Sequence, residues 1–229
     1  MKYLVVSLLA AASLAAHAQS SCSSDGVAAP AGLLERFTNA DCAACWIATD
    51  TPKVAKGDLA LDWVLPGSKG DDAPMSAVAS NDALTRLEAL QLPVPGVTAF
   101  PPRAPRTPRT GGQRLRVALG QPVNEYLGVS IEFKPTTAGP WTAWLVLVET
   151  LPAGTEGSPV ERNLVRNVLQ VDWKRPAAAR AGLSESRSMF LPEGSRPERF
   201  RVAGWVQDGS GRIAAMAVSR CPPETPEKK

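Results

Sequence analysis

The sequence predicts an α+β protein in which a short α/β unit comes first and an antiparallel β-sandwich of immunoglobulin-like kind follows. Hydrophobic residues make up 44% of the chain, which is enough to build a folded core. Strand-like and helix-like patterns alternate between residues 33 and 92, which is typical of an α/β unit. After residue 112 the pattern changes to about seven short strands, which is typical of a sandwich.

The composition limits the number of domains and the class of partner. A chain of 229 residues suits one large domain or two small ones. Its 25 Lys and Arg residues nearly balance its 22 Asp and Glu residues, for a formal charge of +3. Such a chain lacks the strong positive field of a dedicated nucleic-acid binder, so we expect no nucleic-acid partner.

The first eighteen residues have the pattern of a secretory signal peptide. Lys2 precedes an apolar run over residues 4–16, and small residues at Ala16 and Ala18 fit a cleavage site after Ala18. The run is shorter than the roughly 20 apolar residues of a membrane-spanning helix, and no later stretch reaches that length. We therefore predict a periplasmic or secreted protein without a membrane span.

Cleavage after Ala18 would also remove His17, the one histidine of the sequence. A chain without imidazole has neither a Ser-His-Asp nor a Cys-His hydrolytic arrangement, and no metal site that needs a histidine ligand. We predict no cofactor and no metal. Carboxylate, amine, hydroxyl and thiol groups are left for any chemistry.

The first predicted domain covers residues 32–100 and follows a polar N-terminal segment over 19–31. Its expected elements are a strand over 33–38, a helix over 42–51 that ends before Pro52, a strand over 59–65 and a loop over 67–74. The segment Ser80-Asn81-Asp82 is expected to cap a second helix that continues to Leu92, because Leu84, Leu87 and Leu90 recur at helical spacing.

A Pro- and Arg-rich segment over residues 101–112 is predicted to link the two domains. Arg103, Arg106 and Arg109 are spaced between prolines, and the segment ends at two glycines. The prolines disfavour helix and central strand, so we expect a solvated, extended linker. The alternative is that these arginines bind an acidic partner.

The second predicted domain, the β-sandwich, covers residues 113–221 and precedes a charged tail over 222–229. The expected strands are 114–119, 127–133, 141–151, 163–173, 186–191, 199–207 and 212–220, with a tight hairpin at 208–211. Four tryptophans, Trp141, Trp144, Trp173 and Trp205, fall in this half of the chain. We interpret them as core residues, with a sugar-stacking platform as the alternative.

The pair Cys42 and Cys45 is the most specific chemical signal of the sequence. At the start of a helix, the first-turn amides would stabilise a thiolate on Cys42, which makes it the candidate nucleophile and the more accessible and acidic thiol. Cys45, one turn later, would resolve the mixed disulfide. Asp41 would partly oppose this acidity. The alternatives are an inert local disulfide, or half of a zinc site completed by Cys22 and Cys221.

We expect Cys22 and Cys221 to form a second, structural disulfide. In an oxidising compartment the neighbouring Cys42 and Cys45 are the expected local pair, which leaves Cys22 and Cys221 to each other. This bridge would anchor both ends of the mature chain. Free or intermolecular cysteines are the alternative.

Residues 34–45 resemble the Glu-Leu-Phe-Thr-Ser-x-Gly-Cys-x-x-Cys segment of a poorly characterised family of secreted bacterial thioredoxin-like proteins. Glu35, Phe37, Thr38 and both cysteines match it, and the segments 163–166 and 201–208 are similar to later parts of the family pattern. The resemblance implies a thioredoxin-like domain followed by a β-sandwich. It also implies a cis-proline beside the dithiol, for which Pro95 is the candidate and Pro93 the fallback.

Two functions are consistent with these patterns. The first is a periplasmic thiol-disulfide exchange protein that acts through Cys42 and Cys45 on protein thiols or disulfides of the cell envelope. The second is a noncatalytic envelope binding protein with structural disulfides, whose sandwich contacts a protein or a glycan. The neighbouring Asp71 and Asp72 lie in a Gly-rich loop, where we expect a solvated turn rather than a calcium site.

Overall fold

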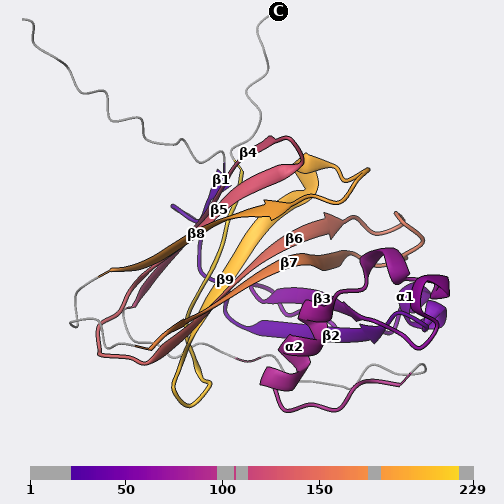
Figure 1. Ribbon diagram of the computed structural model, residues 1–229, viewed down its shortest axis with the longest axis horizontal. Helices are drawn as coiled ribbons and strands as arrows, with labels where there is room; N and C mark the ends of the chain where they lie inside the picture. The colour runs from indigo at the N-terminus through magenta and orange to yellow at the C-terminus, as the bar shows by residue number, and fades with distance from the viewer. Residues whose placement is uncertain (1–21, 97–105, 107–112, 175–181, 222–229) are drawn as a thin grey trace, which may run out of the picture.

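The described part of the chain folds into two β-sheets with two short α-helices at one end (Figure 1). The computed structural model describes residues 22–96, 106, 113–174 and 182–221. One sheet has four strands in the order β1-β4-β5-β8, and the other has six in the order β10-β9-β6-β7-β3-β2. The strands are β1 (Cys22–Ser23), β2 (Leu33–Asn39), β3 (Leu59–Leu65), β4 (Arg114–Val123), β5 (Tyr126–Lys134), β6 (Trp141–Leu151), β7 (Arg162–Trp173), β8 (Leu183–Phe190), β9 (Phe200–Asp208) and β10 (Ile213–Val218).

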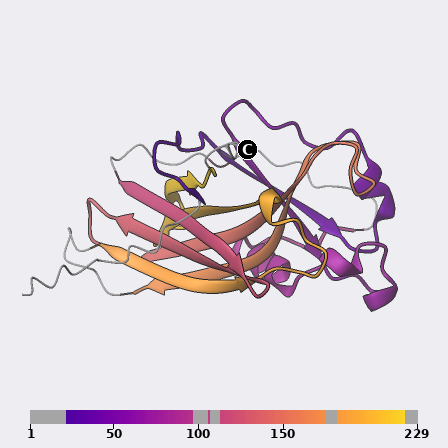
Figure 2. The same ribbon diagram turned by 90° about the horizontal axis from the view of Figure 1, so that it is seen from above.

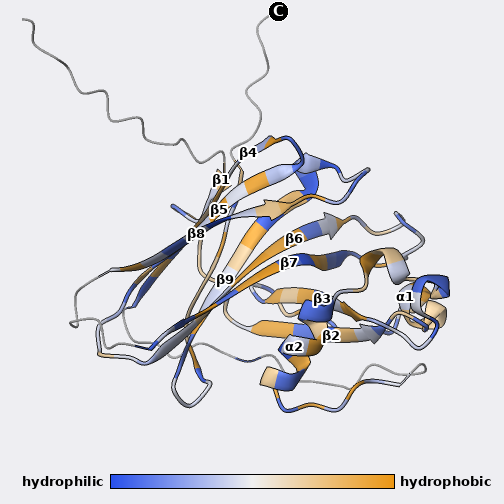
Figure 3. Cartoon of the chain, in the orientation of Figure 1, coloured by the Kyte–Doolittle hydropathy of each residue, from blue (hydrophilic) through white to orange (hydrophobic). Residues whose placement is uncertain are grey.

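The four-stranded sheet packs on one face of β6, β9 and β10, and this contact is the main core. Alternate residues such as Val117, Ile131, Leu145 and Val202 point into it from both layers. A Cβ atom at Gly204 would lie 2.8 Å from Cγ1 of Val117, so glycine at this position lets the two sheets approach closely. Figure 2 shows the two layers from above, and Figure 3 shows apolar residues along the central strands β6 and β9.

The predicted fold class is wrong, because the strands of the first half do not form a separate thioredoxin-like unit. β2 pairs with β3 in parallel, and β3 pairs with β7 of the second half through Asp62 and Leu164. All seven residues of β3 are buried, so this strand needs a neighbour on each edge and cover on each face. The result is a mainly β structure with one mixed sheet, in place of an α/β unit followed by an immunoglobulin-like sandwich.

The two α-helices are α1 (Ala43–Ile47) and α2 (Asn81–Ala89). α2 covers the second face of the six-stranded sheet, where Ala83 and Leu87 join a core with Trp63 and Trp205. It ends three residues before the predicted end, because Gln91 has a φ of 55° and its N–H bonds to the carbonyl of Glu88. Three short 3-10 turns complete the structure at Gly70–Asp72, Ser76–Val78 and Pro197–Arg199.

Within the predicted capping segment over residues 80–82, Ser80 is the N-cap of α2, and its hydroxyl accepts a hydrogen bond from the N–H of Asp82 at 3.0 Å. We predict that Ser80→Ala lowers the free energy of unfolding by about 1 kcal/mol, because the N–H of Asp82 in the first turn then loses its acceptor. Urea unfolding monitored by tryptophan fluorescence measures this loss. Ser80→Asp, which keeps an acceptor at the cap, is the control and should stay close to the wild type.

Most of the predicted strands are present with shifted ends. The strand over residues 59–65 has the predicted bounds, and the hairpin at 208–211 joins β9 to β10 with Gly211 at a φ of 77°. The two-residue strand β1 was not predicted. The signal peptide over 1–18 and the tail over 222–229 lie outside the described residues, as does the predicted linker over 101–112 apart from Arg106. None of the helices in the described part of the chain is long and apolar enough to cross a membrane.

Candidate functional site at the Cys42–Cys45 disulfide

The end of β2 positions the Cys42–Cys45 pair at the start of α1. The N–H of Cys42 bonds to the carbonyl of Asn39 at 2.9 Å, and this turn makes Cys42 the N-cap of α1. The two sulfur atoms form a disulfide with a Cα–Cα distance of 5.3 Å. Both residues are buried: Cys42 is 2% exposed and Cys45 is 6% exposed. Cys42, which the sequence predicts to be the more accessible, is thus the less exposed of the two.

α1 is shorter than the helix predicted over residues 42–51, because a buried arginine takes the carbonyl groups at its end. Nη2 of Arg162 donates to the carbonyl of Cys45 at 3.2 Å and to that of Trp46 at 2.9 Å. Ala48 is then extended. A cation at the C-terminal end of a helix is favourable, because the unpaired carbonyls there carry partial negative charge.

Arg162 belongs to a buried charge cluster that crosses the three neighbouring strands β2, β3 and β7. The carboxylate of Asp62, on β3, accepts from Arg36 at 2.5 Å and from Arg162 at 3.4 Å. It also accepts from the N–H of Asn163 at 2.8 Å. Two guanidinium groups thus share one carboxylate, and the carbonyls of α1 offset the extra positive charge. Burial, the largest effect, lowers the pKa of Arg162, and the charge of Arg36 lowers it further.

Trp46 connects α1 to the loop before β7. Its ring lies 5.2 Å from the guanidinium of Arg162, and its indole N–H donates to the carbonyl of Glu156 at 2.7 Å. A cavity of about 390 Å³ lies beside Trp46 and is lined by Met75 and Leu151 among others. Four of the charged residues around it are paired, Arg166 with Glu149 and Arg199 with Glu156. Glu193 and Arg196 also line it, one residue of each sign.

The carboxylate of Asp41 lies against the loop after β3. It accepts hydrogen bonds from the hydroxyl and the N–H of Ser68, both at 2.8 Å, and these bonds, with the N–H of Lys69, hold the pKa of Asp41 below its usual value. A Cβ atom at Gly67 would lie 2.1 Å from this carboxylate, so the contact requires glycine there. Asp41 thus ties α1 to the 67–69 loop.

Pro95 does not have the geometry that the resemblance implies. Among the described residues the structure has one cis peptide bond, Gly139–Pro140, so neither Pro95 nor Pro93 follows a cis bond. The catalytic roles that the sequence assigns to Cys42 and Cys45 stay predictions. The structure places no described His, Cys, Asp or Glu cluster where it could hold a metal ion.

The second disulfide joins Cys22 to Cys221, the pairing expected from the sequence, with a Cα–Cα distance of 4.1 Å. Next to it, Ser23 and Arg220 exchange two backbone hydrogen bonds, of 3.2 and 2.9 Å. The bridge therefore ties β1 to the chain that follows β10. Figure 1 shows β1 at the top of the molecule beside β4 and α1 at its right-hand end, so the two disulfides fasten separate regions.

A second buried ion pair on the other face of the six-stranded sheet was missed by the sequence analysis. Nε and Nη2 of Arg86, on α2, donate to the two carboxylate oxygens of Glu35 at 2.7 and 2.9 Å. The guanidinium lies 4.4 Å from the ring of Trp144 and 4.8 Å from that of Trp205. Trp144 and Trp205 are core residues, as predicted, and their burial excludes them from a sugar-stacking surface.

Arg106 also binds Glu35, at 2.8 Å, and its backbone pairs with Leu33. The interpretation of this arginine as part of a solvated linker is therefore wrong. The sequence did carry a signal for these groups, since Glu35, Arg36 and Asp62 interrupt strands that are otherwise mainly apolar. A charge inside such a strand is buried on folding and requires a partner.

The ion pairs of Glu35 predict a specific pH dependence of stability. Burial by itself raises the pKa of Glu35, but Arg86 and Arg106 outweigh burial and hold this pKa below its usual value. A lowered folded-state pKa contributes stability above the unfolded value of about 4.3, and this contribution is lost as pH falls through the folded-state pKa. We expect the free energy of unfolding to decrease between about pH 4 and pH 2, and Glu35→Gln to weaken that decrease. An equal slope in both proteins would contradict the assignment.

Comparison with known proteins identifies no family for this chain. No family model matches it, and no curated protein matches it either. Among solved structures, a domain of the outer membrane lipoprotein Omp28 from Porphyromonas gingivalis is similar to 52% of this chain over 94% of its own length. The identity is 10% and the TM-score is 0.35, so this likeness supports no argument about fold or function. The resemblance of residues 34–45 to the secreted thioredoxin-like family stays a prediction.

Proposed function

We propose that the protein is a noncatalytic binding protein of the cell envelope whose two disulfides are structural. The burial of Cys42 and Cys45 is the observation that carries this proposal. An attacking thiolate must reach a sulfur atom in line with the disulfide bond, so a buried disulfide reacts slowly. Arg162 and Asp41 hold the same turn from two sides, which further opposes the movement that would expose it.

The location in an exported compartment follows from the same feature. All four cysteines are paired, and disulfides persist in oxidising compartments such as the periplasm. The signal-like pattern of residues 1–18 supports the same location. With the sulfurs paired in this way, a four-cysteine zinc site is not part of the proposal.

A redox titration of the purified, exported protein tests the proposal. A structural Cys42–Cys45 disulfide should have a reduction potential below about −300 mV, whereas exchange proteins lie between about −270 and −120 mV. The Cys22→Ala/Cys221→Ala variant isolates the signal of the Cys42–Cys45 pair. A potential in the range of exchange proteins, together with reduction of insulin by the dithiol form, would reject the noncatalytic assignment and favour thiol-disulfide exchange.

A further inference from the structure

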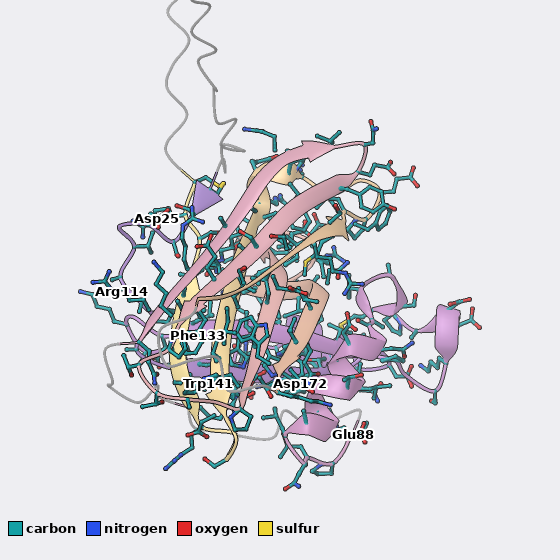
Figure 4. All side chains as sticks on the ribbon, turned by 60° about the vertical axis from the view of Figure 1, so that its left-hand side comes forward. Asp25, Glu88, Arg114, Phe133, Trp141 and Asp172 are labelled. Atoms are coloured by element: carbon teal, nitrogen blue, oxygen red, sulfur yellow. A yellow bond between two sulfur atoms is a disulfide. The ribbon has the colours of Figure 1, made fainter. Side chains whose placement is uncertain are left out.

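The free edge of β10 borders a groove that extends along one side of the sandwich. A cavity of about 560 Å³ is lined by residues 24–26, by β4 and by residues 214–216 of β10. A second cavity of about 390 Å³ continues it toward Pro140 and Gly209, and the two share Gln113 and Ala214. Figure 4 shows Asp25 and Arg114, which line the larger cavity, on the same flank of the molecule.

The backbone of β10 has unpaired groups along this groove. The N–H of Ser219 bonds to the carbonyl of Val202, and Ala217 lies opposite Gly204, so the odd-numbered residues pair with β9. Met216 and Val218 therefore direct their N–H and C=O groups away from β9, and no described residue pairs with them.

β1 begins to occupy this edge and then leaves it. Ser23 pairs with Arg220 just beyond β10, but the N–H of Ser24 bonds to the carbonyl of Val117 on β4. Gly26, at a φ of 73°, then turns the chain away. If β1 continued as a strand along β10, it would fill the larger cavity. The edge of the six-stranded sheet at β10 therefore has room for one more strand.

The charge of the groove indicates what kind of strand would fill it. Arg114 and Lys134 lie directly opposite each other on β4 and β5, and like charges in this position are unfavourable. Neither Arg114 nor Lys134 forms an ion pair with a described residue. Arg116, the next residue of β4 on the same face, is paired with Asp25 and Glu132. A carboxylate in the groove would relieve this repulsion.

A second copy of the chain fits the edge less well. If two β10 strands paired antiparallel about Met216, Arg212 of each copy would lie opposite Arg220 of the other. This arrangement would place one pair of opposed arginines at each end of the paired strands. Ser23 also already occupies the edge at Arg220.

We propose that the β10 groove binds an extended, acidic segment of a partner protein, which adds a strand to the six-stranded sheet. The segment would pair its backbone with Met216 and Val218 and place a carboxylate between Arg114 and Lys134. This inference deepens the proposed binding function and rests on it. Backbone pairing supplies affinity, and the two cations select acidic side chains.

Fluorescence anisotropy with the mature protein and a short labelled peptide of alternating valine and glutamate tests the proposal. We expect saturable binding that weakens at about 1 M salt, where screening acts within about 3 Å. The same peptide with an N-methyl group on every residue has no backbone donor for either edge, so it cannot pair along a strand and should not bind. Equal binding of the N-methylated peptide would overturn the proposal.

Charge reversal provides a test that leaves the core intact. Arg114→Glu/Lys134→Glu should weaken binding of the acidic peptide at least about tenfold, since two attractive contacts become repulsive. The control Lys53→Glu/Lys174→Glu changes the net charge equally at exposed residues outside the groove and should bind like the wild type. Equal loss in both variants would show general charge attraction and reject the groove.

Backbone pairing and self-association are separated by two further measurements. Met216→Pro removes an outward N–H and should abolish binding, whereas Met216→Ala loses the same side chain and should retain it. Sedimentation equilibrium should show a monomer. If the protein is a dimer that Met216→Pro dissociates, the groove binds a second copy of the chain and the proposed partner segment is wrong. These readouts do not depend on Cys42 and Cys45, so the redox titration and the binding assay can fail independently.

Discussion

Removal of the Cys22–Cys221 disulfide by Cys22→Ala/Cys221→Ala is expected to lower the free energy of unfolding by as much as about 5 kcal/mol. The cysteines are 199 residues apart, so the bridge closes a loop that contains most of the 229-residue chain. Such a crosslink reduces the entropy of the unfolded chain, and the reduction grows with the logarithm of loop length. Without it, β1 would be held to the sandwich by a few backbone bonds alone.

The matched control is Cys42→Ala/Cys45→Ala, which removes the same atoms from a loop with a sequence separation of 3. The same entropy relation gives a loss of about 2 kcal/mol for this short loop. Urea unfolding of both variants under nonreducing conditions compares them directly. An equal loss in the two variants would contradict an entropic role for the long bridge.

Local patterns predicted the strands well because they depend on neighbouring residues. Alternation of apolar and polar residues located β5, and the mainly apolar run of residues 59–65 located β3 although Asp62 interrupts it. The pairing of β3 with β7 was not predictable in this way. It joins residues 62 and 164, and no local pattern specifies which buried strand lies beside another.

The candidate site was predictable in its sulfur chemistry but not in its surroundings. The spacing of Cys42 and Cys45 and the count of four cysteines predicted both disulfides. Asp62 and Arg162 meet only because β3 and β7 are neighbours. The buried charge cluster across β2, β3 and β7 therefore depends on the same long-range pairing, which no local pattern predicts. A thiolate on Cys42 would need the aligned amides of the helix predicted over residues 42–51, whereas α1 has five residues.

Arg162→Met is expected to lower the free energy of unfolding by about 3–5 kcal/mol, because it leaves buried partners unsatisfied. The carbonyls of Cys45 and Trp46 would lose their donor. Asp62 would keep Arg36, so the cost is mainly that of the orphaned carbonyls and the emptied guanidinium site. Arg162→Lys keeps the charge but not the planar guanidinium, so its free energy of unfolding should lie between those of the wild type and Arg162→Met.

A second readout separates this anchoring role from a general loss of stability. Without Arg162, α1 should open more often, so dithiothreitol should reduce the Cys42–Cys45 disulfide faster in native conditions, while the rate at Cys22–Cys221 should not change. Arg199→Met is the control, because its pair with Glu156 spans 3.4 Å and the side chain of Glu156 is 58% exposed. Such a pair is worth about 1 kcal/mol or less. If Arg162→Met accelerates reduction of both disulfides equally, global unfolding explains the effect and Arg162 does not specifically hold the Cys42–Cys45 turn.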